Sequence, residues 1–150
     1  LVTTPTLAHR MGKKASAYIS GASVAMGAAT DDNDAIPDGV ALTAALRALP
    51  RGDAIRAIFG QLHVDDRRND EWQAASARNA SSFDPSCHMS IERMVGGLGA
   101  AAGLGNLVFG LATLEHRAGP EDLRPTAPLL AWGISADGPC GVALASLEVA

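Results

Sequence analysis

The residue best suited to chemistry in this chain is His63, which stands at the end of a short apolar run, residues 55–64. An imidazole titrates near neutral pH, so it can serve as a general base and as a hydrogen-bond donor. The length of the run is typical of a buried strand. Because α/β folds place their ligands at the carboxyl ends of strands, we expect a candidate site at this point.

The polar residues that follow His63 allow a second interpretation, a metal site. The residues with oxygen atoms that bind metals follow soon after the imidazole of His63, and they are Asp65, Asp66, Asn69, Asp70 and Glu71. A dense run of charges is more typical of a solvated loop, however. We therefore expect no metal and no other cofactor.

The other histidines and the two cysteines are weaker candidates for a catalytic role. His9 lies in a basic segment, and His116 lies at a helix end, where a cation complements the helix dipole. Cys87 and His88 are adjacent, so on a strand they point to opposite faces and form no thiolate–imidazole pair. Cys140 follows a turn, and we expect it to be packed rather than reactive.

Composition indicates one compact domain that spans residues 1–150. Hydrophobic residues make up 47% of the chain and charged residues 19%, which argues against a disordered protein. A net charge of −4 argues against a nucleic-acid-binding protein, because such a protein carries a basic face. Two cysteines are too few for a disulfide framework, so we expect a reduced, cytoplasmic protein.

Periodicity and turn residues predict eight elements in the order β-α-β-α-β-α-β-β. The predicted strands are 15–26, 55–64, 87–91, 128–135 and 140–149, and the predicted helices are 40–49, 69–79 and 96–116. Strands that alternate with helices predict a mixed, largely parallel sheet of five strands with helices on both faces.

The segment 94–114 contains no charged residue and six glycines. Its length and hydrophobicity allow a membrane span, but the glycines and Asn106 favour a helix buried in an α/β core. Because each glycine costs a helix about 1 kcal/mol relative to alanine, we expect Gly99, Gly103 and Gly110 to face a closely approaching element. One chain of this size has too little sheet to cover such a helix, so we expect a partner.

Several strings, taken in order, resemble the C-terminal half of the β-ketoacyl synthases, which are thiolase-fold condensing enzymes. Residues 8–21 resemble the motif A-x-x-R-G-A-x-x-Y-A-x-x-x-G, and 37–39 resemble the turn P-x-x-D-G before a helix. Residues 96–103 resemble G-H-L-L-G-A-A-G, which opens the family's buried helix. The resemblance covers nearly the whole chain. It implies a thiolase-like half-domain whose glycine-rich helix from Gly96 is buried against a partner half.

The departures from the family concern its catalytic residues. The resemblance implies a Cys nucleophile from the N-terminal half and two His from this half, which assist decarboxylation and hold the thioester oxyanion. Gln61 stands at the position of the first His and Gly97, which has no side chain, at that of the second. Glu92 replaces the Lys of the string K-S-x-x-G-H, and residues 135–138 replace the gate G-F-G-G.

The alignment around Gln61 leaves two alternatives. Residues 60–72 resemble a pattern found in divergent synthase-like proteins, which keep the fold while drifting from condensing chemistry. A shifted register instead makes His63 the surviving first His, which leaves half of a catalytic pair.

The resemblance implies a subunit or fragment of a ketosynthase-like protein in fatty-acid or polyketide-type metabolism. Our first expectation is a non-condensing role, either chain-length-factor-like or as the wall of an acyl cavity. The second is an active Claisen-type enzyme, with His63 as base and oxyanion partner and a Cys from another chain. The third is an assembly scaffold without activity. The implied partners are an N-terminal ketosynthase-like half or a second subunit, in a homo- or hetero-oligomer, and an acyl carrier protein.

Overall fold

The structure is a computed structural model that describes residues 3–27, 38–50, 52, 54–61, 66–116, 128–135 and 139–148. The elements are, in order, α1 (Pro5–Arg10), β1 (Ala17–Met26), α2 (Val40–Arg47), β2 (Ile55–Gly60), α3 (Asp66–Arg78), η1 (Ala80–Ser82), β3 (Phe83–Met89), α4 (Glu92–Val95), η2 (Gly99–Ala101), α5 (Ala102–Glu115), β4 (Leu129–Ile134) and β5 (Pro139–Leu147). The two elements η1 and η2 are short 3-10 helices.

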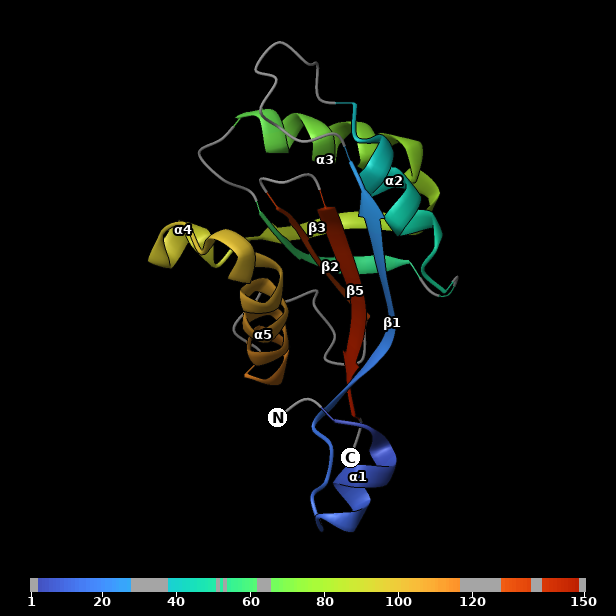
Figure 1. Cartoon of the computed structure of the whole chain (residues 1–150), viewed down its shortest axis with the longest axis vertical. Coiled ribbons are helices and arrows are strands. Elements are labelled where there is room, and N and C mark those ends of the chain that lie inside the picture. Colours follow the sequence, from blue (N-terminus) through green and yellow to red (C-terminus); the bar gives the residue numbers. More distant parts are fainter. Residues whose placement is uncertain are drawn as a thin grey trace.

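The five strands form one mixed sheet in the order β1-β5-β4-β2-β3 (Figure 1). β2 is parallel to both of its neighbours, β3 and β4, whereas β5 is antiparallel to both of its neighbours, β1 and β4. Four strands therefore run in one direction and β5 runs against them. The predicted five-stranded mixed sheet is confirmed, but the sheet is not largely parallel, since two of its four strand pairs are antiparallel.

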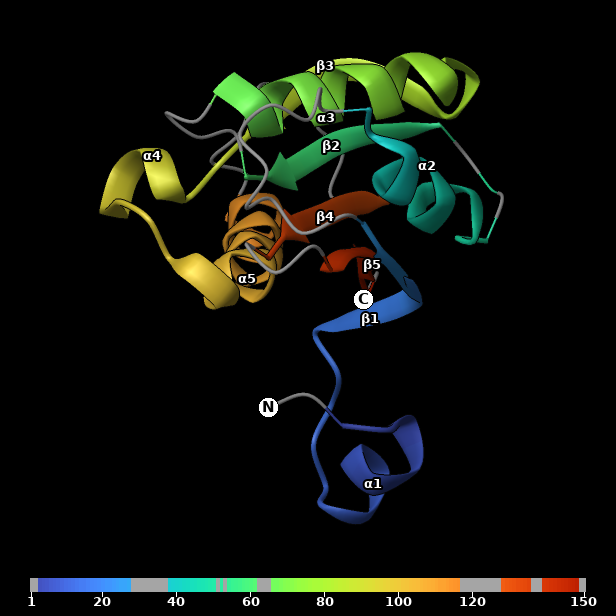
Figure 2. The ribbon, with the colours of Figure 1, turned by 45° about the horizontal axis from the view of Figure 1, so that its top comes forward.

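Helices cover both faces of the sheet, as the sequence predicted (Figure 2). α2 and α3 lie on one face, where Trp72 packs with Trp132 in an apolar cluster. α5 lies on the other face, where Leu107 and Phe59 belong to a second cluster. β4 at the centre is buried from both sides, and residues 129–132 are each at most 2% exposed.

The short helix α1 was not predicted, and it stands away from the sheet in both views. It begins where Pro5 occupies its first turn and where the N–H of Leu7 donates to Oγ1 of Thr4 over 3.3 Å. Both features favour a helix start. Six residues are too few for helical periodicity to be recognised in a sequence window.

Two predicted elements begin earlier in the structure. β3 begins at Phe83, although Asp84 and Pro85 predict a loop there. The sheet order makes β3 an edge strand, and an edge strand accommodates a proline because one side of its backbone needs no ladder partner. α3 begins at Asp66 rather than at Asn69.

The helix predicted for 96–116 is shorter than expected, because glycines break the segment before it. α4 ends at Val95, and Gly96 and Gly99 then adopt positive φ angles of 85° and 54°. This left-handed backbone suits glycine and cannot continue a helix. Among the residues described, no helix has the length and hydrophobicity that crossing a bilayer needs.

Two glycines of α5 make the close approach that the sequence predicted. A Cβ on Gly110 would lie 2.6 Å from the ring of Phe59, and a Cβ on Gly133 of β4 would lie 3.0 Å from the backbone of Gly103. Gly99, in contrast, has no atom of the described residues within 4 Å of an added Cβ. A Cβ on Gly103 itself would lie 3.9 Å from the backbone of Gly133, which is an ordinary contact. The predicted approach is therefore tight at Gly110, looser at Gly103 and wrong for Gly99.

The outward side of α5 is apolar and open. Leu104 and Val108 are each 59% exposed, and on β1 the side chains of Val24 and Met26 are 72% and 73% exposed. Within the described residues, α5 is thus buried on one face rather than on all sides. The sequence favoured a helix buried in the core, but a single sheet can cover only one face of a helix.

We predict that Gly60→Ala destabilises the fold, because the added Cβ would lie 1.9 Å from Nε1 of Trp132. Overpacking of this kind costs about 1–3 kcal/mol in the free energy of unfolding. Gly97→Ala is the matched control, since no atom in the described part of the chain lies within 4 Å of a Cβ there. Urea denaturation followed by tryptophan fluorescence measures both variants. Equal midpoints for the two variants would contradict the prediction.

Candidate functional site

The carboxyl ends of β2, β3 and β4 meet at one edge of the sheet, because β2 is parallel to both other strands. Gln61 follows β2, Ser90 follows β3 and Ser135 follows β4. The start of α5 reaches the same edge, since the N–H of Ile91 donates to Oδ1 of Asn106 over 3.0 Å. Open α/β sheets bind ligands at such an edge, so we treat it as the candidate site.

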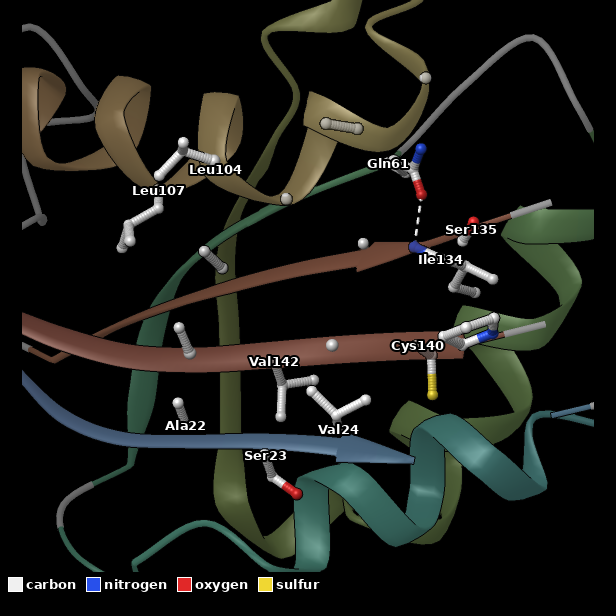
Figure 3. Close-up of a pocket in the computed structure, with 18 residues that line it drawn as sticks. Ala22, Ser23, Val24, Gln61, Leu104, Leu107, Ile134, Ser135, Cys140 and Val142 are labelled. Atoms are coloured by element: carbon white, nitrogen blue, oxygen red, sulfur yellow. Dashed lines mark hydrogen bonds between the residues drawn. The ribbon is translucent and has the colours of Figure 1, made fainter. Parts of the chain in front are cut away.

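Gln61 is fully buried at this edge, and the orientation of its carboxamide is fixed. The N–H of Ile134 donates to its Oε1 over 2.6 Å (Figure 3). Its Nε2 is also buried and has no hydrogen-bond partner among the described residues. A buried amide without a partner costs about 1–3 kcal/mol. This nitrogen is therefore a candidate donor to a ligand.

Buried polar side chains hold the segment that leads from β3 to α5. Glu92 is buried, and its Oε1 accepts a hydrogen bond from the N–H of Leu98 over 3.1 Å. Asn106 accepts from the N–H of Ile91 and donates to the carbonyl of Ala102, both over 3.0 Å. Oε2 of Glu92 has no partner in the described part of the chain. Two buried polar side chains, Glu92 and Asn106, thus fix the approach to α5.

A cavity of about 420 Å³ lies beside Gln61, between α5 and the strands β4, β5 and β1 (Figure 3). Gln61 and Ser135 line one side of it, and Ala22 and Val24 of β1 line another. None of the described residues that line it is charged. Its volume lies within the roughly 300–1,000 Å³ that is usual for small-molecule sites.

Of the residues singled out from the sequence, Gln61 is in the cavity wall, and His63 lies outside the described residues. Gly97 is exposed, and no atom of the residues that the structure describes lies within 4 Å of a Cβ placed on it. His9 lies in the last turn of α1 and His116 caps α5, both exposed. Among the described residues no group of His, Cys, Asp and Glu could hold a metal ion.

Cys140 lines the cavity, but its thiol is engaged. Sγ donates to the carbonyl of Ala25 over 3.4 Å. Burial raises the pKa of the Cys140 thiol, so little thiolate forms at neutral pH. The prediction that Cys140 is packed is confirmed by its burial, and its thiol is a poor nucleophile.

On the opposite face of the sheet, His88 joins two tryptophans. Nε1 of Trp132 donates to Nε2 of His88 over 3.2 Å, and Trp132 stacks on Trp72 with ring centroids 5.0 Å apart. Burial, followed by the positive charge of Arg93, lowers the pKa of His88 to about 4. The imidazole is therefore neutral at pH 7, and the indole occupies the lone pair that a general base would need.

Ser135 lines the cavity, although the sequence pointed to it only as the first residue of the segment 135–138 and not as a site residue. It is half-buried at the end of β4, and it lines the same cavity as Gln61 (Figure 3). A signal was present, since Ser135 is the first polar residue after the apolar run that begins at Pro128. Its neighbour Gln61 is far away in the chain, however, so the fold is needed to bring the two together.

Comparisons with known proteins assign no family to the chain. No model of a protein family matches it, and no curated protein matches it. Its function therefore has to be argued from the fold and the site.

We predict that the protein loses stability as the pH falls from about 6.5 to about 4. The pKa of His88 is lowered from its ordinary 6.5 to about 4 in the folded state. Between these values the unfolded chain binds one more proton at this residue, so the free energy of unfolding decreases as the pH falls. The contribution of His88 is at most about 3 kcal/mol.

Urea denaturation at pH 7 and pH 4.5 measures this loss in the wild type and in His88→Gln. Carboxylates titrate in both proteins, so the difference between the two losses in the free energy of unfolding is due to His88. His116→Gln is the control, because His116 is exposed at the end of α5. We expect this control to follow the wild type. If His88→Gln loses as much stability between pH 7 and pH 4.5 as the wild type does, the prediction is wrong.

Proposed function

We propose that this chain is a ketosynthase-like half-domain that forms one wall of an acyl cavity and carries out no condensation by itself. Gln61 carries this proposal. The resemblance puts a catalytic His at the end of the second strand, where the structure has a buried amide held by the N–H of Ile134. An amide does not change its charge near neutral pH, whereas an imidazole does.

The lost imidazoles matter because decarboxylative condensation develops negative charge on a thioester oxygen. Positioned donors must meet that charge, and the loss of one such donor costs other enzymes about 10²–10³ in rate. Gln61 keeps a donor in Nε2, but Gly97 has no side chain, although its surroundings leave room for one. A site of this composition favours binding over turnover.

Two features of the fold support the proposal. The resemblance implies a five-stranded mixed sheet with helices on both faces, and the chain has this architecture. The exposed apolar side chains of Leu104 and Val24 line the same cavity. Val108, also exposed, lies one helical turn from Leu104 on α5. Apolar surface of this kind is typical of protein–protein interfaces. In this proposal it receives the partner half, which supplies the second wall.

We predict that the protein, purified with any partner it retains, releases no CO₂ from malonyl-N-acetylcysteamine labelled in the free carboxyl. An active condensing enzyme of the same family serves as the positive control. His63→Ala is measured in parallel, because His63 is the one side chain that a shifted register makes catalytic. We expect no release above the uncatalysed rate from either protein.

Turnover that His63→Ala abolishes would overturn this proposal and assign the chemistry to His63. Turnover that survives the substitution would place the chemistry on the partner. Absence of turnover together with absence of acyl binding would favour the assembly scaffold.

We predict further that the isolated chain self-associates through the apolar surface of α5. Val108→Lys adds a charge to this surface at a site that is 59% exposed, so it should weaken association without lowering stability. Val40→Lys is the matched control, since Val40 is 57% exposed on α2, on the other face of the sheet. Sedimentation velocity measures association. A wild-type chain that stays monomeric at tens of micromolar would contradict the prediction.

A further inference from the structure

We propose that a second cavity, lined by Arg47 and Arg78 at the opposite end of the sheet from Gln61, binds a phosphate monoester with an apolar organic group. The two arginines hold the phosphate at the mouth of the cavity, and apolar side chains receive the organic group. This inference goes beyond the function proposed above and does not depend on it, because the two cavities share none of their described residues.

The second cavity has a volume of about 770 Å³ and lies where three parallel strands begin. Its wall includes Ile55 at the start of β2, Phe83 at the start of β3 and Pro128 just before β4. Gln61 follows the other end of β2, so the length of this strand separates the two cavities. The volume is usual for a small-molecule site.

The charge of the second cavity is positive. Arg47 is the last residue of α2 and Arg78 is the last residue of α3. A cation at a helix C-terminus complements the helix dipole, but that effect does not require the two arginines to meet in one cavity. None of the described residues that line the cavity is an Asp or a Glu. A phosphate monoester, which carries about two negative charges at pH 7, therefore balances the two arginines.

Both guanidinium groups keep donors for a ligand. Nη1 of Arg78 donates to the carbonyl of Asp38, which holds the group in place and leaves its other N–H groups. Arg47 has no hydrogen-bond or ion-pair partner among the described residues. Guanidinium N–H groups bind phosphate oxygens in pairs, and the hydroxyls of Ser81 and Ser82 lie in the same wall. A phosphate monoester has three terminal oxygens for these donors, whereas a carboxylate has two.

The exposure of the wall residues indicates where each part of the ligand lies. Arg47 and Arg78 are exposed, whereas Leu46, Ile55 and Leu144 are buried. The phosphate therefore stays near solvent and loses only part of its hydration, which keeps the cost of binding low. The organic group contacts the buried leucine and isoleucine side chains, so removal of its apolar surface from water favours binding.

The methyl groups of two isoleucines report which cavity a probe enters. Ile55 lines the second cavity, and Ile134 lines the cavity beside Gln61. The protein, with any partner it retains, is labelled with ¹³C in the δ1 methyl groups of isoleucine, and Ile55→Val and Ile134→Val assign the two signals. The probe is 1-naphthyl phosphate. We expect this probe to shift the signal of Ile55 and to leave the signal of Ile134 unmoved.

Calorimetric titration then tests the role of the charges. Arg47→Gln removes one exposed ion pair, so it should raise the dissociation constant of 1-naphthyl phosphate about fivefold. Arg47→Lys keeps the charge without the paired donors and should give an intermediate value. Arg10→Gln makes the same change at an exposed arginine of α1 and should bind like the wild type. The wild type should bind 1-naphthol and 1-naphthoate at least about tenfold more weakly than the phosphate ester.

The results that would overturn this inference are distinct. If millimolar 1-naphthyl phosphate leaves the signal of Ile55 unmoved, the second cavity binds no such ligand. A shift of Ile134 in place of Ile55 would assign the ligand to the cavity beside Gln61. Equal affinity of the wild type and Arg47→Gln, or of the phosphate ester and 1-naphthol, would show that the arginines hold no phosphate. None of these results bears on the proposed function, which the release of CO₂ tests separately.

Discussion

The close fit of the Trp132 indole over the backbone of Gly60 is the constraint on which the rest of the structure depends. The ring occupies the space that a Cβ at position 60 would need, 1.9 Å from Nε1. From there it stacks on Trp72 of α3 and donates to His88 of β3. The indole of Trp132 on β4 therefore connects α3 and β3 to β2. Because Gln61 follows Gly60 directly, the same fit sets where the candidate site lies.

The candidate site combines buried polar atoms with an uncharged cavity wall. Nε2 of Gln61 and Oε2 of Glu92 are buried without partners in the described part of the chain. Such atoms lower stability and are uncommon in folded proteins, so they call for an explanation. In the function proposed above, the nitrogen of Gln61 belongs to a site that binds without turnover.

Local signals in the sequence were sufficient for most of the fold. Turn residues and periodicity located the five strands, α2 and α3, because each of these signals acts within about ten residues. The start of β3 could not be predicted, since the fit of Pro85 depends on the edge position of the strand. The break at Gly96 was missed because glycine in an apolar run is typical both of helix packing and of a helix end. Gln61 could be located as a strand-end residue, but its bond to Ile134 spans 73 residues.

The pairing of β1 with β5 has a consequence for synthesis on the ribosome. The two strands are neighbours from Ala17–Leu147 to Met26–Pro139, and Tyr18 donates to Glu148 across 130 residues of chain. β1 is a ten-residue strand without charge or proline. At the usual rate of translation, on the order of ten seconds passes before its partner emerges. Throughout that time the nascent chain carries an unpaired apolar strand, so its yield in the cell depends on protection from neighbouring chains until β5 arrives.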